Sequence, residues 1–203
     1  MKFGLVFVIF MLLVTGCGPA AQAPTATATA FPATATAAPT LATNPSSAPP
    51  ALTLAVLKNS IYMLQSSGAP LQITLVDGAF KLNDPKLNLS ITGRLIEPVA
   101  FGDLNGDGEP DAAVIIAANF GGSGTFHELI VMLSKSGQTV QAASLALGDR
   151  IQEKQLTIQN GIILLDYLRQ GATDPMCCPA ERAMTTYQLK EGKLVVLSDK
   201  ILK

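Results

Sequence analysis

Short runs of alternating apolar and polar residues, joined by tight-turn pairs, constrain the fold of this chain more than any other feature. Residues 155–159 and 162–168 flank Asn160-Gly161, and this combination is typical of a β-hairpin with a two-residue turn. Asp77-Gly78 and Glu191-Gly192 stand between similar segments and predict two further hairpins. The pattern therefore predicts antiparallel sheets in which chain neighbours pair.

Two other runs are apolar without alternation. Residues 112–117 and 129–133 suit central strands whose two faces are both buried. A short helix is expected near residues 52–64, and a turn or a second helix near residues 141–147. Because strands do not alternate with long helices, a doubly wound α/β fold is not expected. We expect a mainly β domain, with α+β as the alternative, built as an antiparallel hairpin meander with one or two short helices.

The first 51 residues differ in composition from the rest of the chain. Lys2, the apolar run 3–14 and the small residues after it predict a secretory signal peptide over residues 1–16, too short to span a bilayer. Residues 17–51 carry no charge and consist mostly of Ala, Thr and Pro, which predicts a disordered linker. Residues 52–203 then form a single β-rich globular domain, long enough to have its own core.

The end of the leader, Val14-Thr15-Gly16-Cys17, resembles the lipobox of bacterial lipoproteins. The resemblance implies cleavage before Cys17, a diacylglycerol on its sulfur and a fatty acyl chain such as palmitate on the new amino terminus. These lipids would anchor the protein in the bacterial cell membrane, with the domain on the extracytoplasmic side. The alternative is an ordinary signal peptide near a chance cysteine.

Charge and hydropathy exclude other partners. The net charge is −1 and no Lys or Arg cluster stands out, so a nucleic-acid surface is not expected. No apolar run after residue 51 reaches the length of a membrane span. The expected contact with the membrane is therefore the N-terminal lipid.

The segment 103–111 places oxygen donors at the spacing that calcium loops use. Side-chain oxygens stand at loop positions 1, 3, 5 and 9, Gly108 at position 6 permits a sharp turn, and position 7 offers a carbonyl. The expected Ca²⁺ ligands are Asp103, Asn105, Asp107, Glu109 and Asp111. Such an ion would stabilise the loop, and the alternative is a metal-free Asn/Asp/Gly turn.

This loop resembles the calcium loops of EF-hand-like and dockerin repeats. With residues 99–102 before it and the apolar strand after it, the segment is more similar still to FG-GAP and VCBS-type repeats of extracellular β proteins. The resemblance implies that Asp103, Asn105, Asp107 and Asp111 are the ligands. Val114 stands where a helical EF-hand has a bidentate Glu, which predicts weak binding, and a single copy of the loop cannot build a propeller.

Residues 119–127 form a glycine-rich segment between two expected central strands, and we expect a flexible hairpin loop there. No Lys and no following helix complete a phosphate-binding loop, and Thr125 stands where a nucleophile elbow needs Gly. We expect no catalytic residue in this segment. The alternative is a hydrolase that uses Ser123 and His127, the single histidine of the chain.

Cys177 and Cys178 are adjacent, and the export signal places them in an oxidising compartment. Since Pro175 and Pro179 restrict the backbone nearby, we expect a strained vicinal disulfide at a rigid loop tip. A reduced buried pair, bonds to another chain and a thiol-redox role remain alternatives. The Cys-Cys-Pro segment also resembles LppP/LprE-type lipoproteins, which implies no activity.

Together, these features resemble a group of bacterial lipoproteins and secreted proteins. We expect a membrane-anchored extracytoplasmic lipoprotein, not an enzyme, that displays a calcium-stabilised β-rich binding or structural domain. Its partner would be a protein or a glycan of the cell envelope. The alternative is an envelope hydrolase or thiol-redox protein that uses Ser123/His127 or Cys177/Cys178.

Overall fold

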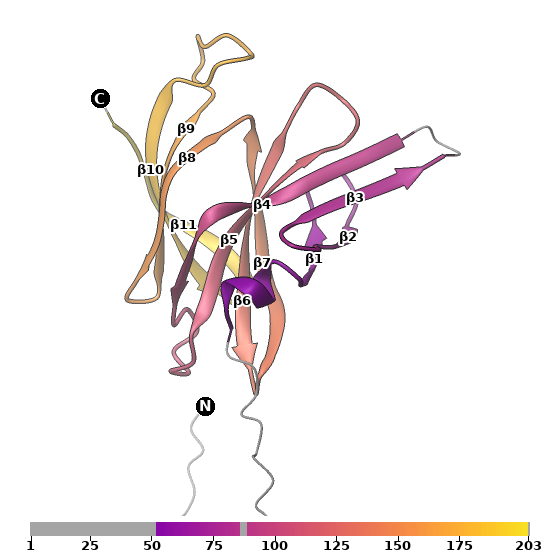
Figure 1. The fold of residues 1–203 in the computed structure, drawn as a ribbon. Helices are drawn as coiled ribbons and strands as arrows, with labels where there is room; N and C mark the ends of the chain where they lie inside the picture. The colour runs from indigo at the N-terminus through magenta and orange to yellow at the C-terminus, as the bar shows by residue number, and fades with distance from the viewer. Residues whose placement is uncertain (1–51, 86–88, 203) are drawn as a thin grey trace, which may run out of the picture. The chain divides into compact units, whose positions relative to one another are not determined.

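The computed structural model describes residues 52–85 and 89–202, which form the mainly β, antiparallel domain that the alternation predicts (Figure 1). The expected signal peptide, Cys17 and the linker lie outside the described residues. The elements are α1 (Leu54–Leu57), β1 (Ile61–Leu64), β2 (Leu71–Thr74), β3 (Ala79–Asp84), β4 (Leu89–Gly102), β5 (Asp111–Asn119), β6 (Phe126–Lys135), β7 (Gln138–Asp149), β8 (Gln152–Gln159), β9 (Ile162–Arg169), β10 (Glu181–Lys190) and β11 (Lys193–Ile201).

The strands form three antiparallel sheets in which chain neighbours pair. A five-stranded sheet has the order β3-β4-β5-β6-β7, a four-stranded sheet has the order β11-β10-β9-β8, and β1 pairs with β2 alone. Two of the predicted hairpin turns are present. Both residues of Asn160-Gly161 and of Glu191-Gly192 have positive φ, between 49° and 74°, as a turn of type I′ requires.

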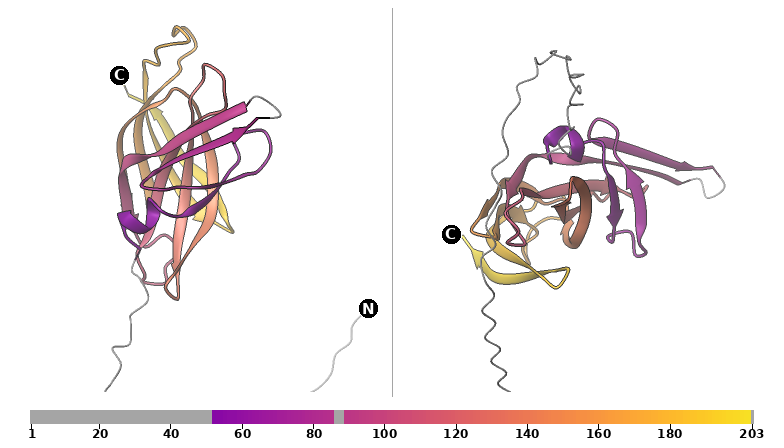
Figure 2. Two further views of the ribbon diagram at one scale, coloured as in Figure 1. Left: turned by 45° about the vertical axis from the view of Figure 1, so that its right-hand side comes forward. Right: turned by 90° about the horizontal axis from the view of Figure 1, so that it is seen from below.

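The five-stranded sheet is the middle of three layers (Figure 2, right). One face packs on the four-stranded sheet, and the other is covered by α1 and the β1–β2 pair. In β5, Ala113 and Ile115 enter the first core, whereas Val114 and Ile116 enter the second. The prediction that residues 112–117 and 129–133 are buried on both faces is therefore confirmed, because period-2 side chains of a middle sheet enter two cores.

The expected hairpin at Asp77-Gly78 is wrong in its strand pairing. The tight turn is present, since Val76 and Ala79 exchange backbone hydrogen bonds at 2.8 and 3.1 Å. However, β2 before the turn pairs with β1, and β3 after it joins the five-stranded sheet. Burial accounts for the difference: Tyr62 and Leu64 of β1 are fully buried in the second core, and β2 follows β1 there.

The helix expectations also need correction. The helix near residues 52–64 is a single turn capped by the Thr53 hydroxyl, and β1 begins soon after it. Residues 141–147 belong to β7 and form no helix. Although alanine favours a helix, tertiary contacts override that preference. For example, the side-chain amide of Gln141 accepts the amide hydrogen of Met63 at 2.8 Å and donates to the Met63 carbonyl at 2.9 Å.

Candidate functional site

The carboxylate loop, residues 103–110, connects β4 to β5 at one end of the domain. The turns Asn160-Gly161 and Glu191-Gly192 lie at the same end, and the three segments line a cavity of about 620 Å³. We call this cavity the carboxylate-loop cleft. Its polar side chains are those of Asp103, Asn105, Asn160, Gln188 and Glu191, and Leu104 and Leu189 add apolar surface.

Asp103 lies at the centre of the loop. Its Oδ1 accepts the amide hydrogens of Asn105 at 3.2 Å and Gly106 at 2.6 Å, and its Oδ2 accepts that of Gly108 at 3.0 Å. The amides of Gly106 and then Gly108 lower the pKa of Asp103. Asp103 is therefore a partly exposed anion around which the backbone of the loop curls.

Asn105 and Asp107 repeat the same kind of contact further along the loop. Asn105 Oδ1 accepts from the Asp107 amide, and Asp107 Oδ1 accepts from the Glu109 amide, both at 2.8 Å. The Asn105 Nδ2 also donates to Asp107 Oδ2 at 2.7 Å. Gly106 and Gly108 have φ of 83° and 82°, a conformation that favours glycine. The alternating spacing of the loop thus places three polar side chains together.

The side chain of Asp111 is buried in the domain, where it accepts hydrogen bonds from two backbone amides. It has no exposed surface, its Oδ2 accepts from the Leu104 amide at 2.9 Å, and its Oδ1 accepts from the Ser134 amide of β6 at 3.0 Å. Burial raises the pKa of Asp111, and the two amides oppose that shift. Asp111 anchors the loop to β5 and β6, a role that its position in the motif does not reveal.

Ca²⁺ is bound by several hard oxygen ligands, and the loop has to supply them for a calcium site. The described residues contain no group of three or more His, Cys, Asp or Glu side chains placed to hold a metal ion. Asp111 has no exposed surface, and the third side-chain oxygen beside those of Asp103 and Asp107 comes from the amide of Asn105. All of these donors are hard oxygens. Asp103 Oδ1 already accepts two amides, whereas Asp103 Oδ2 and Asp107 Oδ1 accept one amide each and keep a free lone pair. The chemistry of the loop therefore fits Ca²⁺.

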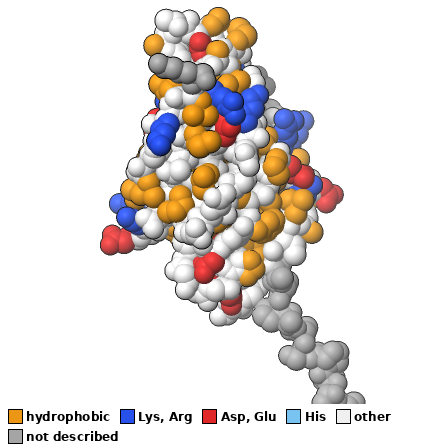
Figure 3. Space-filling model, turned by 90° about the vertical axis from the view of Figure 1, so that its left-hand side faces the viewer, with side chains coloured by type: hydrophobic (Ala, Val, Ile, Leu, Met, Phe, Trp, Pro, Cys, Tyr) orange, Lys and Arg blue, Asp and Glu red, His pale blue; other side chains and the backbone are white. Residues whose placement is uncertain are grey.

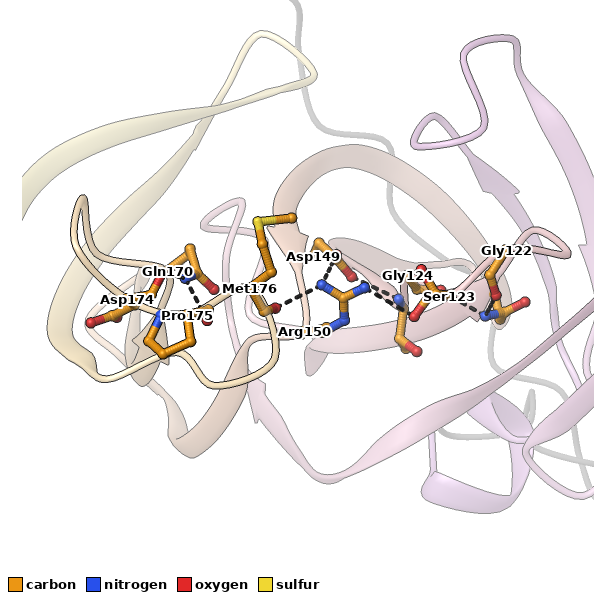
Figure 4. Close-up of polar contacts among 11 residues, drawn as sticks. Gly122, Ser123, Gly124, Asp149, Arg150, Gln170, Asp174, Pro175 and Met176 are labelled. Carbon is orange, nitrogen blue, oxygen red and sulfur yellow. Dashed lines mark hydrogen bonds and ion pairs between the residues drawn. The ribbon is translucent and has the colours of Figure 1, made fainter.

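At the opposite end of the domain, Arg150 connects the glycine-rich loop to the loop that carries the cysteine pair (Figure 4). Its Nη2 donates to the carbonyl of Ser123 at 3.0 Å, and its Nη1 donates to the carbonyl of Met176 at 2.8 Å. Asp149 Oδ2 lies 2.8 Å from the same Nη1. No sequence motif marks Arg150, so only the structure identifies it.

The structure separates the residues of the hydrolase alternative. Ser123 is exposed in the loop, whereas His127 is buried in β6, where its Nε2 lies 3.5 Å from Glu153 Oε1 of β8. Within residues 52–85 and 89–202, no hydrogen bond joins Ser123 to His127. Glu128, the sequence neighbour of His127, faces the β1–β2 loop instead.

The sulfur atoms of Cys177 and Cys178 lie within bonding distance of each other, and their Cα atoms are 3.8 Å apart. Asp174 holds this loop by accepting the amide hydrogens of Gly171 at 2.8 Å and Ala180 at 2.7 Å. These two amides lower the pKa of Asp174. The arrangement is that of the expected vicinal disulfide, whose oxidation state stays a prediction.

Figure 3 shows the side of the molecule that carries the four-stranded sheet. Hydrophobic side chains are spread over it, and Lys and Arg side chains gather near its upper end. Arg182 donates to both oxygens of Asp166 at 3.0 and 2.7 Å, which lowers the pKa of Asp166. In the described part of the chain, no helix is long and apolar enough to cross a membrane.

Comparison with known proteins adds no relative to this description. No family model, no curated protein and no solved structure matches the chain.

Proposed function

We propose that this protein is a lipid-anchored extracytoplasmic lipoprotein whose β domain binds a hydroxyl-rich component of the cell envelope beside a calcium-stabilised loop. The observation that carries the proposal is the position of the carboxylate loop, which forms one wall of the 620 Å³ cleft. A cavity of this size lies in the range of ligand sites. The lipid anchor rests on the resemblance of residues 14–17 to a lipobox.

The lining of the cleft favours a glycan ligand. Amide and carboxylate groups from Asn105, Gln188 and Glu191 both accept and donate, which suits the hydroxyl groups of a sugar. Leu189 offers a small apolar surface on which the C–H face of a sugar ring packs.

Ca²⁺ would be held by Asp103, Asn105 and Asp107 and by the carbonyl of Glu109, with Asp111 anchoring the loop behind them. The ion would supply positive charge that neutralises the exposed carboxylates, so that the wall of the cleft becomes rigid. No reaction step is assigned to it.

A calcium titration of the full-length protein in detergent tests the metal. The melting temperature is expected to rise with the Ca²⁺ concentration and to level off by about 10 mM. This concentration is above the dissociation constants typical of extracellular calcium modules. Asp103→Asn should remove the increase, whereas Asp77→Asn, in a turn outside the loop, should keep it. An unchanged melting temperature of the unmodified protein throughout the titration would exclude the calcium site.

Amide NMR with tri-N-acetylglucosamine as the probe tests the ligand. The signals of Gly106, Gly161 and Gly192, which line the cleft, are expected to shift in calcium and to shift less after chelation. Gln188→Ala should weaken binding, and Gln152→Ala at the other end of the domain should not. If these glycines stay unshifted with this sugar and with a panel of envelope oligosaccharides, the domain has a structural role and the glycan proposal fails.

A further inference from the structure

The free edge of β7 opens between the two outer layers of the domain. β7 ends the five-stranded sheet and pairs with β6 alone. Residues 141–144 line a cavity of about 500 Å³, and residues 145–147 line a smaller cavity of about 210 Å³. Because the side chains of a strand alternate between its two faces, cavities lined by consecutive residues follow the edge of the strand. We call these two cavities together the edge groove.

The walls of the edge groove come from both outer layers. Met63 and Gln65, at the end of β1, line one side of the larger cavity, and Gly192 and Lys193 of the four-stranded layer line the other. Val196 of β11 lines the smaller cavity and is 51% exposed. An opening between two layers has room for one extended segment, whereas a second folded copy would bring its own outer layers against these walls.

The backbone of β7 has unused hydrogen-bonding groups at this edge. Every second residue of an edge strand directs its N–H and C=O away from the sheet. In the part of the chain that the structure describes, no backbone–backbone hydrogen bond outside the β6–β7 ladder reaches residues 142–147. Bulges at Ala142 and Leu147 leave residues 143–146 as the regular part of the edge. These four residues are therefore the ones that another strand can pair with.

β7 also lacks two common means of protecting an edge strand. Natural edge strands often carry charged residues or proline, which discourage pairing with a further strand. Residues 138–148 contain neither. An uncharged strand beside this edge would therefore meet no charge repulsion from β7.

The two faces of β7 define which side chains an added strand would carry. Ala143 belongs to the first core and Leu145 packs against it, so both point toward the four-stranded sheet. Directly opposite residues of neighbouring strands point to the same face, and Leu145 and Val196 line the same cavity. Apolar residues therefore suit the positions opposite Ala143 and Leu145. Ser144 and Ala146 face the β1 layer, and polar residues suit the positions opposite them.

Lys193 adds a positive charge at the end of the groove where residues 141–144 lie. Its side chain is exposed, and the ion pairs found in the described part of the chain do not include it. All pairs in the central sheet are antiparallel. A strand that runs antiparallel to β7 would place its C-terminal end beside Lys193, where an acidic residue pairs with the ammonium group.

We infer that the edge groove binds an extended peptide segment of another protein, which adds a sixth strand to the central sheet beside residues 143–146. The segment runs antiparallel to β7. Its apolar residues alternate with polar ones and face Val196, and an acidic residue at its C-terminal end lies beside Lys193. The groove adjoins the carboxylate-loop cleft at Gly192 and shares no other lining residue with it, so the peptide site and the glycan site can fail separately.

Hydrogen exchange in the full-length protein in detergent, followed by NMR, tests the added strand. The probe is the peptide acetyl-Thr-Val-Thr-Val-Glu-amide, whose alternation matches that of the groove. At about ten times its dissociation constant, the probe should slow exchange of the outward-facing amides of residues 143–146 by about tenfold. A version N-methylated at all Thr and Val nitrogens keeps the side chains but cannot donate from them, and it should not bind.

Variants test the side-chain contacts. Val196→Gln should bind the probe at least about threefold more weakly, because it loses the apolar contact. Val195→Gln is the matched control, since Val195 is also exposed but lies on the opposite face of β11, and it should bind unchanged. Lys193→Gln should weaken binding of the probe about threefold, but not binding of a probe that ends in Gln. Lys154→Gln, on β8, should affect neither.

The inference is overturned if about 10 mM probe leaves the exchange of residues 143–146 unchanged, or if the N-methylated peptide binds as well as the probe. It is also overturned if Val196→Gln binds the probe as tightly as the unmodified protein does. Sedimentation of the protein alone addresses a second copy as the occupant. A monomer is expected, and a dimer that Val196→Gln dissociates would assign the groove to a second copy instead.

Discussion

Glu128 on β6 accepts the amide hydrogen of Gln65, in the loop after β1, with both carboxylate oxygens at 2.9 Å. Ser66 adds its amide at 3.1 Å and its hydroxyl at 2.8 Å to Oε2. Glu128 is only 1% exposed, so these donors are what make its burial tolerable. The contact fixes the β1–β2 layer to the central sheet. Because adjacent residues of a strand face opposite sides of the sheet, Glu128 and His127 cannot belong to one site.

Glu128→Ala should therefore destabilise the domain by about 3 kcal/mol, because it leaves the Gln65 and Ser66 amides without their acceptor. Urea unfolding measures the change. Lys81→Ala, on the exposed surface of β3, is the control and should change the free energy of unfolding by less than about 0.5 kcal/mol. Equal stabilities of the two variants would show that the buried carboxylate does not hold this layer.

Asp111→Asn should lower stability even without calcium. The amide of Asn has one acceptor oxygen, so either Leu104 or Ser134 would face an NH₂ group, at a cost of about 1–3 kcal/mol. Chemical unfolding in a chelator separates this effect from metal binding. Asp107→Asn, whose side chain is exposed, is the matched control and should be nearly neutral under the same conditions.

Gly102→Ala should be poorly tolerated just before the carboxylate loop. A Cβ atom at Gly102 would lie 2.6 Å from Ile158 Cγ2, so β4 and β8 would have to move apart. Overpacking of this kind costs about 1–3 kcal/mol. Gly122→Ala provides the comparison, because nothing lies within 4 Å of its Cβ position. The expected result in thermal unfolding is a lower melting temperature for the first variant only.

Removing the Arg150 side chain should loosen two loops at once. Arg150 has a φ of 53°, so Arg150→Gly removes the contacts to Ser123 and Met176 without straining the backbone. Hydrogen exchange should become faster in residues 120–125 and 171–180, with little change in β5. Arg169→Gly, on the four-stranded sheet, is a control whose effect should not reach residues 120–125. If exchange in both loops matches the unmodified protein, the bridge does not order them.

His127 should make the domain less stable in mild acid. Burial lowers the pKa of His127 from its ordinary 6.5; Arg94 acts in the same direction, while Glu153, the Thr125 carbonyl and Asp149 oppose it. The unfolded chain then binds a proton near pH 6.5 that the folded chain does not, so stability falls as the pH drops below about 7.

His127→Gln removes this contribution. Between pH 7.5 and 5.5, the variant should lose less free energy of unfolding than the unmodified protein loses, as measured by urea unfolding at each pH. Parallel pH profiles for the two proteins would contradict a neutral buried imidazole.

How far the sequence predicts this protein depends on the range of the forces involved. Turn chemistry at Asn160-Gly161 and Glu191-Gly192 is local, and the alternation of side chains is a property of each strand by itself. The mainly β class, the chain-neighbour pairing and the two-sided burial of residues 112–117 could therefore be predicted. The spacing of Asp103, Asn105 and Asp107 likewise identified the loop in which these three side chains meet.

Contacts between residues far apart in the chain carry no such local signal. The buried position of Asp111 depends on Ser134, the place of Glu128 depends on Gln65, and the link between the two conspicuous loops depends on Arg150. Residues 141–147 became a strand because packing and pairing outweigh helix propensity. The sequence by itself thus determined the mainly β class, the two hairpin turns and which loop gathers oxygen donors. Only the tertiary structure decided which carboxylates face solvent and which face the core, because burial is set by distant strands that the local pattern does not specify.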